Sequence, residues 1–599
     1  MTSPGSPAEP SHRTGHTRAL LTLAAVAVAF AAADTYVVVL ALPDLMQGVG
    51  LSVDELQRAA PIVSGFLLGY VAMLPLIGRI SDLRGRVPVL VAGLVVFAAG
   101  SLVTALAYDL PSLVCGRFFQ GVGGGALVPA TLALVADLYP VERRGVPLGL
   151  VSAVQEIGSV LGPLLGAVVL AVADWRAIFG LNLVVGAVLA VAIGRLRRVD
   201  AGPPADPSSG RRVDVLGLVL LCAAVAAGVL TAVRPEPILR DLTWGQLYIP
   251  VPGLSPFGRW VTPLGLATIA LLAGFVLRCL FAARPAVDLR GWWRAARTAD
   301  LPGAVLLAVA LGGVILTFAT ADPQVELISP QGGWYLAGSA VATIALVVHL
   351  RRTPDPLIPT ATLRPRAAWG GVLVSFFVGA ALVAALIDIP LFARTTVHSD
   401  SQLMAALVLV RFLIALPAGA VVGGWLLRRL GAGIVAGVGM LLAAAAFVLM
   451  SRWDLDSLAH FSATVPLLLG GFGFGLALAP VNAAVLAVTA PAVHGLAGAL
   501  VVVARMIGML VGISALTALG LRRYYAEQAD VPPAAEVCGG PTRCDAYNDL
   551  LQQAGIAQEQ VVFAGAAVCA VLAAVLAIAL FRGAPTRELP AGEALRGHR

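Results

Sequence analysis

The chain has 599 residues, of which 59% are hydrophobic and only 12% are charged, with a formal net charge of +7. Soluble domains carry about 25% charged residues, so this composition excludes a soluble globular protein. The basic side chains are all arginines and cluster beside apolar segments, so the positive charge does not indicate nucleic-acid binding. The composition therefore predicts a polytopic membrane protein.

Sixteen apolar segments of about 18–26 residues follow one another, and each is long enough to cross a bilayer as a helix. They are 18–43, 58–78, 88–108, 112–137, 146–172, 176–195, 214–233, 261–282, 301–319, 333–350, 368–392, 402–427, 433–451, 464–489, 495–520 and 560–582. The first segment has an alternative interpretation as a signal peptide cleaved after Ala29-Phe30-Ala31. It is longer than the apolar core of such a peptide, which favours a membrane span.

Arginines mark every second connection between these segments. The connections 78–86, 195–212 and 351–366 are rich in arginine, whereas 44–57 has none. Arginine-rich loops stay in the cytoplasm. With this alternation and an even number of segments, both termini are also expected in the cytoplasm. The chain would then be a multi-pass protein of the cell (inner) membrane. Fourteen segments would give the same orientation, so this distribution does not fix the number of segments.

The chain divides into two six-helix halves with extra segments between them. We expect an N-terminal half at 1–195, a linker at 196–367 and a C-terminal half at 368–599. The linker holds four segments, alternatively two. The four resemble one hairpin copied twice, because Asp214-Val-Leu-Gly-Leu-Val-Leu-Leu221 matches Asp300-Leu-Pro-Gly-Ala-Val-Leu-Leu307. Chance similarity between apolar helices is the alternative.

Three charged residues lie in the middle of apolar segments: Asp34, Glu156 and Arg505. A charge at this depth costs about 2.5–3.5 kcal/mol on insertion scales. Such residues are usually paired or line a path for ions or substrate, so these three are candidates for the functional centre.

A glycine and arginine motif, Gly78-Arg-Ile-Ser-Asp-Leu-Arg-Gly-Arg86, joins the second and third segments. Gly78 and Gly85 permit a tight turn and close helix contact, and Arg86 follows directly. Asp82 can accept hydrogen bonds from the N-terminus of a facing helix or from an arginine. The alternative is an ordinary basic loop. Gly424 and Gly431 repeat the glycine spacing in the second half, with Arg428 in the place of Asp82.

The fourth and fifth segments carry further motifs. Arg117 precedes Gln120-Gly121 and is either a charge facing the central cavity or a side chain reaching the outer interface. After Glu156, three glycines recur every four residues on one helix face, with a proline that loosens the helix: Gly158, Gly162, Pro163 and Gly166. Small residues at this spacing let a neighbouring helix approach closely, which packing alone would also explain.

In this order and on these segments, the motifs resemble the major facilitator superfamily, in its drug:proton antiporter branch with extra central helices. Within that branch the chain is most similar to the mycobacterial-type lipid exporters that work with a periplasmic lipoprotein. The similarity lies in Asp34-Thr-Tyr-Val-Val-Val39, Gln155-Glu156, Leu413-Ile-Ala-Leu-Pro-Ala-Gly419 and Val501-Val-Val-Ala-Arg-Met-Ile-Gly-Met-Leu510. The resemblance implies an all-helical major facilitator fold and export of triacylglyceride-like lipids or amphipathic drugs.

Members of that family pair an acid on the fifth segment with an arginine on the penultimate one, which corresponds to Glu156 and Arg505. The chain departs from the family in two respects. It has four central segments instead of two, and Arg411 adds a charge to the twelfth segment.

These residues suggest a mechanism of proton coupling. We expect Glu156 and Arg505 to bridge the halves as a conformational gate, and Asp34 to carry the proton, with Arg117 near its path. The alternative is a static pair that holds the halves together. The proton is the only expected coupling ion, and no metal or organic cofactor is expected.

The last outward connection, 521–560, is long and contains two cysteines, Cys538 and Cys544, around a Gly-Gly-Pro turn. The outside is oxidising, so a disulfide is predicted. The connection is either a docking or guiding element, for lipid or a lipoprotein, or a loop of no special role. No His-x-x-x-His, paired-carboxylate or Gly-x-Ser-x-Gly arrangement supports a lipid-modifying enzyme. We therefore expect a monomeric transporter and not an enzyme, with a multidrug exporter as the main alternative.

Overall fold

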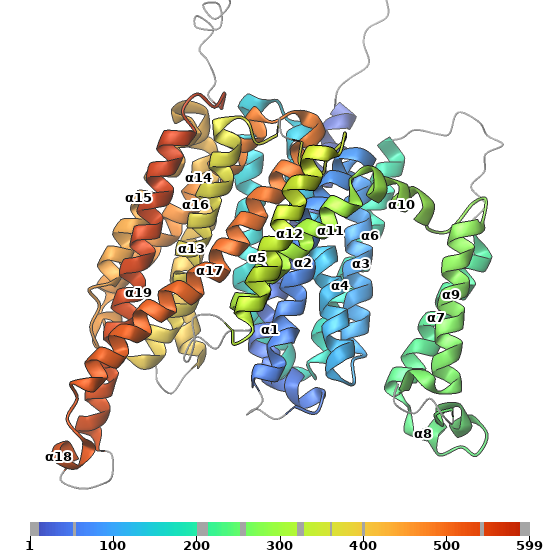
Figure 1. The fold of residues 1–599 in the computed structure, drawn as a ribbon, viewed down its shortest axis with the longest axis horizontal. Helices are drawn as coiled ribbons and strands as arrows, with labels where there is room; N and C mark the ends of the chain where they lie inside the picture. Colours follow the sequence, from blue (N-terminus) through green and yellow to red (C-terminus); the bar gives the residue numbers. More distant parts are fainter. Residues whose placement is uncertain are drawn as a thin grey trace, which may run out of the picture.

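The computed structural model describes residues 11–51, 56–200, 214–251, 259–319, 329–359, 362–397, 402–538 and 544–586. Regular structure in these residues is entirely helical (Figure 1). Fifteen of the helices are long and apolar enough to cross a membrane. The one remaining predicted segment, 146–172, corresponds to α5, a helix of 28 residues that packs on α1 and α14. The all-α membrane fold is therefore confirmed, and all sixteen predicted segments are long helices.

The first six long helices form the N-terminal half. They are α1 (Ser11–Gly48), α2 (Leu56–Arg84), α3 (Arg86–Ala105), α4 (Leu110–Leu138), α5 (Gly145–Val172) and α6 (Arg176–Asp200). The last six long helices form the C-terminal half. They are α13 (Arg366–Thr395), α14 (Gln402–Leu430), α15 (Ala432–Met450), α16 (Thr464–Val488), α17 (His494–Ala529) and α19 (Asp545–Leu580), with the short α18 (Ala534–Cys538) before the last.

The two halves repeat one packing pattern. In the N-terminal half α3 packs on α4 and α6, α2 on α4, and α1 on α5. In the C-terminal half α15 packs on α16 and α19, α14 on α16, and α13 on α17. Between the halves α5 packs on α14, and α17 packs on α2. This is the arrangement of two structural repeats around a central site that many transporters share.

Two apolar hairpins connect the halves: α7 (Val215–Val233) with α9 (Pro263–Phe281), and α11 (Leu301–Ala319) with α12 (Gly332–Arg352). The second hairpin packs on α2 and α17. The first stands beside the bundle at the right of Figure 1. The short helices α8 (Glu236–Leu239) and α10 (Leu289–Thr298) lie at the ends of the first hairpin.

Both hairpins are closed by the same polar arrangement. Asp214 caps α7 by accepting from the Gly217 amide, and also accepts from Arg278 of α9 and the Ala286 amide. Asp300 accepts from the Gly303 amide, contacts His349 of α12 at 2.7 Å, and accepts from the Leu357 amide. In each hairpin the basic residue precedes the donating amide by eight positions. This shared arrangement favours a repeated hairpin over chance similarity.

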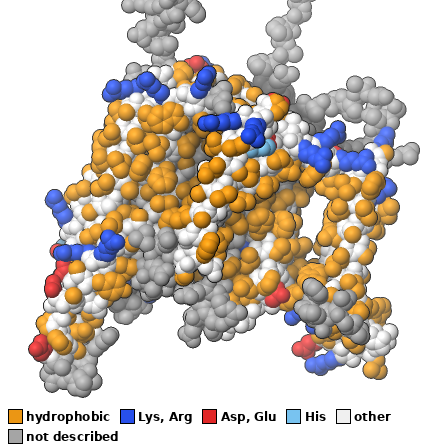
Figure 2. Space-filling model, viewed as in Figure 1, with side chains coloured by type: hydrophobic (Ala, Val, Ile, Leu, Met, Phe, Trp, Pro, Cys, Tyr) orange, Lys and Arg blue, Asp and Glu red, His pale blue; other side chains and the backbone are white. Residues whose placement is uncertain are grey.

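Both described termini lie at one end of the bundle, the top of Figure 1. We call this end the inner end and the opposite end the outer end. At the inner end Arg84 of α2 contacts Asp288 at 2.6 Å and covers the ring of Trp292 on α10. Figure 2 shows a broad apolar surface between the two ends, with arginines gathered mainly near the inner one. The chain is a multi-pass membrane protein.

Candidate functional site

A buried ion pair lies inside the N-terminal half. Arg117 of α4 contacts the carboxylate of Asp34 on α1 at 2.8 Å, and both side chains are at most 1% exposed. Asn182 of α6 donates to the other oxygen of Asp34. The Arg117 guanidinium also lies 4.4 Å from the ring centre of Phe66. Arg117 is therefore an internal partner of Asp34 and does not reach the outer interface.

Further polar groups extend this cluster. Arg117 donates to Gln120 at 3.0 Å, and Gln120 in turn donates to Ser101 of α3 at 2.9 Å. The Thr104 hydroxyl also donates to Gln120. All of these side chains are buried. Because buried polar groups are costly unless they are hydrogen-bonded, this network holds the Arg117 charge in one position.

A second ion pair joins the two halves. Glu156 of α5 and Arg505 of α17 approach to 4.0 Å, and the two residues are 7% and 9% exposed. Tyr70 of α2 lies close enough to both charges to interact with them electrostatically. Removing one partner of a buried pair leaves an uncompensated charge, so the pair links the conformation of α5 to that of α17.

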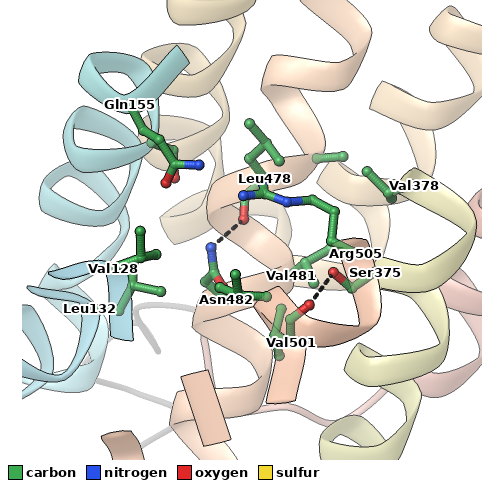
Figure 3. Close-up of a pocket in the computed structure, with 13 residues that line it drawn as sticks. Val128, Leu132, Gln155, Ser375, Val378, Leu478, Val481, Asn482, Val501 and Arg505 are labelled. Carbon is green, nitrogen blue, oxygen red and sulfur yellow. Dashed lines mark hydrogen bonds between the residues drawn. The ribbon is translucent and has the colours of Figure 1, made fainter. Parts of the chain in front are cut away.

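A small cavity lies beside this pair, between the halves (Figure 3). Its walls come from α4, α5, α13, α16 and α17. Gln155 and Asn482 approach it from opposite halves, together with Arg505. The Asn482 amide donates to the Leu478 carbonyl, whereas its oxygen is buried and has no hydrogen-bond partner. The cavity thus presents polar groups from both halves within mainly apolar walls.

At the inner end the predicted loop motif connects the halves. The Asp82 carboxylate accepts from the Gly495 amide at 2.8 Å and the Leu496 amide at 3.1 Å, at the N-terminus of α17. Arg86 contacts Asp82 at 2.8 Å and Asp137 of α4 at 3.1 Å. Asp82 therefore has both kinds of partner considered from the sequence, a helix N-terminus and an arginine.

Glycines allow the halves to touch at this end. Gly78 lies against Gly495, and Gly145 of α5 lies against Gly424 of α14, so a side chain at any of them would meet facing backbone. Gly85 has φ +93° and Gly431 has φ +81°, a backbone region that favours glycine. The two glycine motifs thus occupy matching places in the two halves.

The glycines after Glu156 face α1. A Cβ at Gly158 would meet the Ala29 carbonyl, and one at Gly162 would meet the Ala33 carbonyl. Gly508 and Gly512 of α17 lie in the same way against Phe376 and Ala380 of α13. Small residues at this spacing bring helix backbones together. The second half therefore carries its own copy of the glycine pair, which the sequence reading missed. Pro163 and Gly166 lie further along α5.

Helices α17 and α19 extend beyond the other helices at the outer end, as Figure 1 shows at the lower left. Cys538 and Cys544 are joined by a disulfide at the tip, within 521–560. Arg411, which the sequence left without a role, donates to Thr464 of α16 at 3.2 Å. It is tied to its own half and does not approach Glu156 or Arg505 in any contact among the described residues.

The sequence comparisons identify the family. Residues 24–349 match the model of the Major Facilitator Superfamily. The triacylglyceride transporter of Mycolicibacterium hassiacum is 36% identical over 86% of this chain and 82% of its own length. The triacylglyceride transporter Rv1410c of Mycobacterium tuberculosis is 36% identical over 94% of each chain. The chain belongs to the major facilitator superfamily.

Solved structures of superfamily members share the fold. The human organic anion transporter MFSD10 superposes with a TM-score of 0.55 at 14% identity, over 94% of this chain and 99% of its own. The proton:xylose symporter XylE superposes with a TM-score of 0.52 at 14% identity, over 97% and 99% of the two chains. Both matches support the major facilitator fold alone.

Several polar residues of this superfamily member escaped the sequence analysis. Asn182, Ser101 and Thr104 are ordinary residues in apolar runs, and only their contacts with Asp34 and Gln120 make them part of the site. No paired carboxylates were predicted from the sequence. The structure brings Asp388 of α13 and Glu559 of α19 together, although they are 171 residues apart. A charge inside an apolar segment was the available signal for Asp388, and it was overlooked.

Proposed function

We propose that this transporter exports triacylglyceride-like lipids or other amphipathic compounds from the cell (inner) membrane, in exchange for protons and by alternating access. The names of the relatives support the lipid substrate, since proteins 34–36% identical over most of the chain are called triacylglyceride transporters. Both termini would lie in the cytoplasm, so the inner end faces the cytoplasm and the outer end the outside.

The observation that carries the mechanism is the ion pair between Glu156 and Arg505 across the two halves. In this structure the inner end is closed by Asp82 and the glycine contacts. We propose that the pair stabilises this closed arrangement. When the inner end opens, α5 and α17 separate, and each charge must find another partner.

Asp34 is the proposed proton carrier. Its carboxylate is paired with Arg117 in this state, so binding a proton would weaken that ion pair and free the α1–α4 contact. Asn182 on α6 would hold the acid in place through the change. No organic cofactor or metal takes part in this scheme, and the proton is the coupling ion.

The extended α17–α19 pair is a proposed path or docking element for lipid, or for a periplasmic lipoprotein. Its protrusion beyond the bundle supports this role (Figure 1). Replacing both cysteines by serine, with export and lipoprotein capture measured together, tests it. Unchanged export in a variant lacking 530–543 would contradict it. The transporter is proposed to act as a monomer.

The decisive experiment uses purified protein in proteoliposomes with a proton gradient and labelled triacylglyceride. Export should follow the gradient in wild type, stop in Asp34→Asn, and persist in Glu236→Gln, a control that removes an exposed acid from α8. Recovery of chemically unchanged lipid excludes a lipid-modifying enzyme. Gradient-driven export of drugs but not of lipid would instead support a multidrug exporter.

A further inference from the structure

Two acids that the scheme above does not use meet inside the C-terminal half. Asp388 lies on α13 and is 7% exposed, and Glu559 lies on α19 and is 1% exposed. The two carboxylates are close enough to interact electrostatically. Buried acids without a role in the site already described are candidates for a further ion-binding position.

The register of the two helices places these acids opposite each other. The helices run in opposite directions, and the Gln552 side chain of α19 donates to the Thr395 carbonyl of α13. Asp388 lies seven residues before Thr395, and Glu559 lies seven residues after Gln552. At the inner end Gly370 packs on the side chain of Leu580, so the two helices stay in contact along their length.

No cation neutralises this pair among the described residues. One oxygen of Glu559 accepts from Gln558 at 3.2 Å, whereas the other is buried and has no hydrogen-bond partner. Buried oxygens are normally hydrogen-bonded, so this orphaned oxygen needs an explanation.

The other charged and titratable side chains of the surrounding helices are exposed near the outer end, have other partners, or lie at the inner end. The exposed ones near the outer end are Arg394, Arg452, Asp454, Asp456, His460, Arg522, Tyr525, Asp530 and Asp549, with Tyr524 and Tyr547 half-buried there, whereas His494 begins α17 at the inner end. Three arginines have other partners: Arg411 with Thr464, Arg505 with Glu156 and Arg523 with Glu527. Four belong to the inner end: Arg366, Arg428, Arg429 and Arg582. Cys569 lies ten residues further along α19.

We infer that Asp388 and Glu559 bind one proton between them, as a second proton site in the C-terminal half. Two like charges in a shared buried position cannot both ionise without a large cost. A single proton removes one of the charges and supplies an O–H donor to the partner carboxylate. The shared proton would therefore give the buried Glu559 oxygen a hydrogen-bond partner without the help of any other group.

The site lies toward the outer end. Gln560, next to Glu559, donates to the carbonyl of Trp453, which follows the end of α15 at Met450. The rings of Phe392, Trp453 and Phe563 form a cluster one helical turn from the acids, with centres 5.3–6.3 Å apart. Phe392 lies one turn toward the outer end from Asp388, whereas Phe563 lies one turn toward the inner end from Glu559, so the aromatic cluster packs beside the acids and limits water access at their depth.

The site also has a structural connection to the ion pair between the halves. Gly379, nine residues before Asp388 on α13, packs on the backbone of Arg505. Ser375 on the same helix donates to the Val501 carbonyl at 2.8 Å. Loss of the proton would place two charges between α13 and α19 and move α13 relative to Arg505. This coupling role rests on the proposed function, whereas the bound proton does not.

Infrared spectroscopy of the full-length protein in nanodiscs tests the proton directly. The carboxylic-acid carbonyl absorbance is followed against pH in wild type, Asp388→Asn, Glu559→Gln and the double variant, with Asp549→Asn as control. The amides keep the shape of the acids, and size-exclusion chromatography checks folding. The double variant should lack a band that wild type and Asp549→Asn show at neutral pH.

In each single variant the remaining acid no longer faces a second carboxylate charge. It should therefore lose its proton at a pH at least one unit below that of wild type, which corresponds to a tenfold lower proton affinity. Equal titration in wild type and both single variants, or an unchanged band in the double variant, would overturn the proton site. Saturable loss of the band with sodium but not choline would identify a sodium site and also overturn it. Wild-type export that ignores the proton gradient would refute the proposed function while leaving these spectra unaffected.

Discussion

Glu156 and Arg505 occupy nearly the same place on the two repeats. Glu156 lies two residues before Gly158 of α5, and Arg505 lies three residues before Gly508 of α17. Both glycines pack on the first helix of their own half, α1 and α13 respectively. One repeat therefore supplies the acidic residue and the other the basic residue, and the ion pair forms where the two repeats meet.

This relationship predicts the effect of reversing the charges. Glu156→Gln or Arg505→Gln alone should reduce export at least tenfold, because one buried charge loses its partner at a cost of about 3–5 kcal/mol. The double variant Glu156→Arg/Arg505→Glu should recover part of the export and of the melting temperature. Labelling of single cysteines from both membrane faces reports the inward and outward populations. Unaltered accessibility in both single variants would show a static pair.

The contributions of Asp34 and Arg117 to stability and to transport should be separable by mutation. Asp34→Asn leaves Arg117 buried without a counter-charge and is expected to destabilise the protein by about 3–5 kcal/mol. Asp34→Asn/Arg117→Gln removes both charges and should restore most of the stability, measured by thermal unfolding in detergent. Export should remain absent in the double variant. Proton-driven export by the double variant would argue against Asp34 as the carrier.

Asp82 should control closure of the inner end. Its carboxylate accepts two backbone hydrogen bonds from the N-terminus of α17, and charge-assisted bonds contribute about 1.5–3 kcal/mol each. Asp82→Asn should therefore open the inner end, which spin-label distances between α2 and α17 would detect. Arg84→Gln, which breaks the contact with Asp288 outside the interface between the halves, is the control. Distances that stay the same in Asp82→Asn would exclude this role.

The glycine pairs should tolerate no side chain. Gly158→Ala and Gly508→Ala each place a methyl group against a facing carbonyl, so each should destabilise the protein by about 1–3 kcal/mol. Gly338→Ala in α12 is the matched control, since a methyl group there meets nothing within 4 Å. The amount of folded protein and its melting temperature give the comparison. If all three variants behaved alike, close packing of α1 on α5 and of α13 on α17 would be ruled out as the reason for these glycines.

The α7–α9 hairpin should loosen in acid. Hydrogen bonds from the Gly217 amide and from Arg278 lower the pKa of Asp214 below its ordinary value. Such a carboxylate stabilises the folded state above its unfolded pKa of about 3.9, and the contribution disappears as the pH falls through the lowered folded value. A spin label at Val287→Cys, in protein without other free cysteines, should gain mobility below about pH 4. Asp214→Asn should show that mobility at neutral pH, and rigidity there would contradict the prediction.

Much of the fold followed from the sequence. Apolar length predicted all sixteen long helices, because a bilayer requires about 20 apolar residues from any span. The repeated Asp-x-x-Gly starts at Asp214 and Asp300 suggested the two hairpins, and glycine spacing indicated where α5 and the loop at Gly78 need close contact. These features are local, so they can be recognised without knowing what lies opposite.

The partners of the charged residues required the tertiary structure. The sequence located Asp34, Glu156 and Arg505 by their cost in the membrane and, with the family resemblance, suggested the pair of Glu156 with Arg505. It left Asp34 without its partner Arg117 and passed over the facing acids Asp388 and Glu559. Hydropathy fixes which segments enter the membrane, whereas the rotation and register of packed helices decide which side chains meet, and those depend on contacts between residues far apart in the chain.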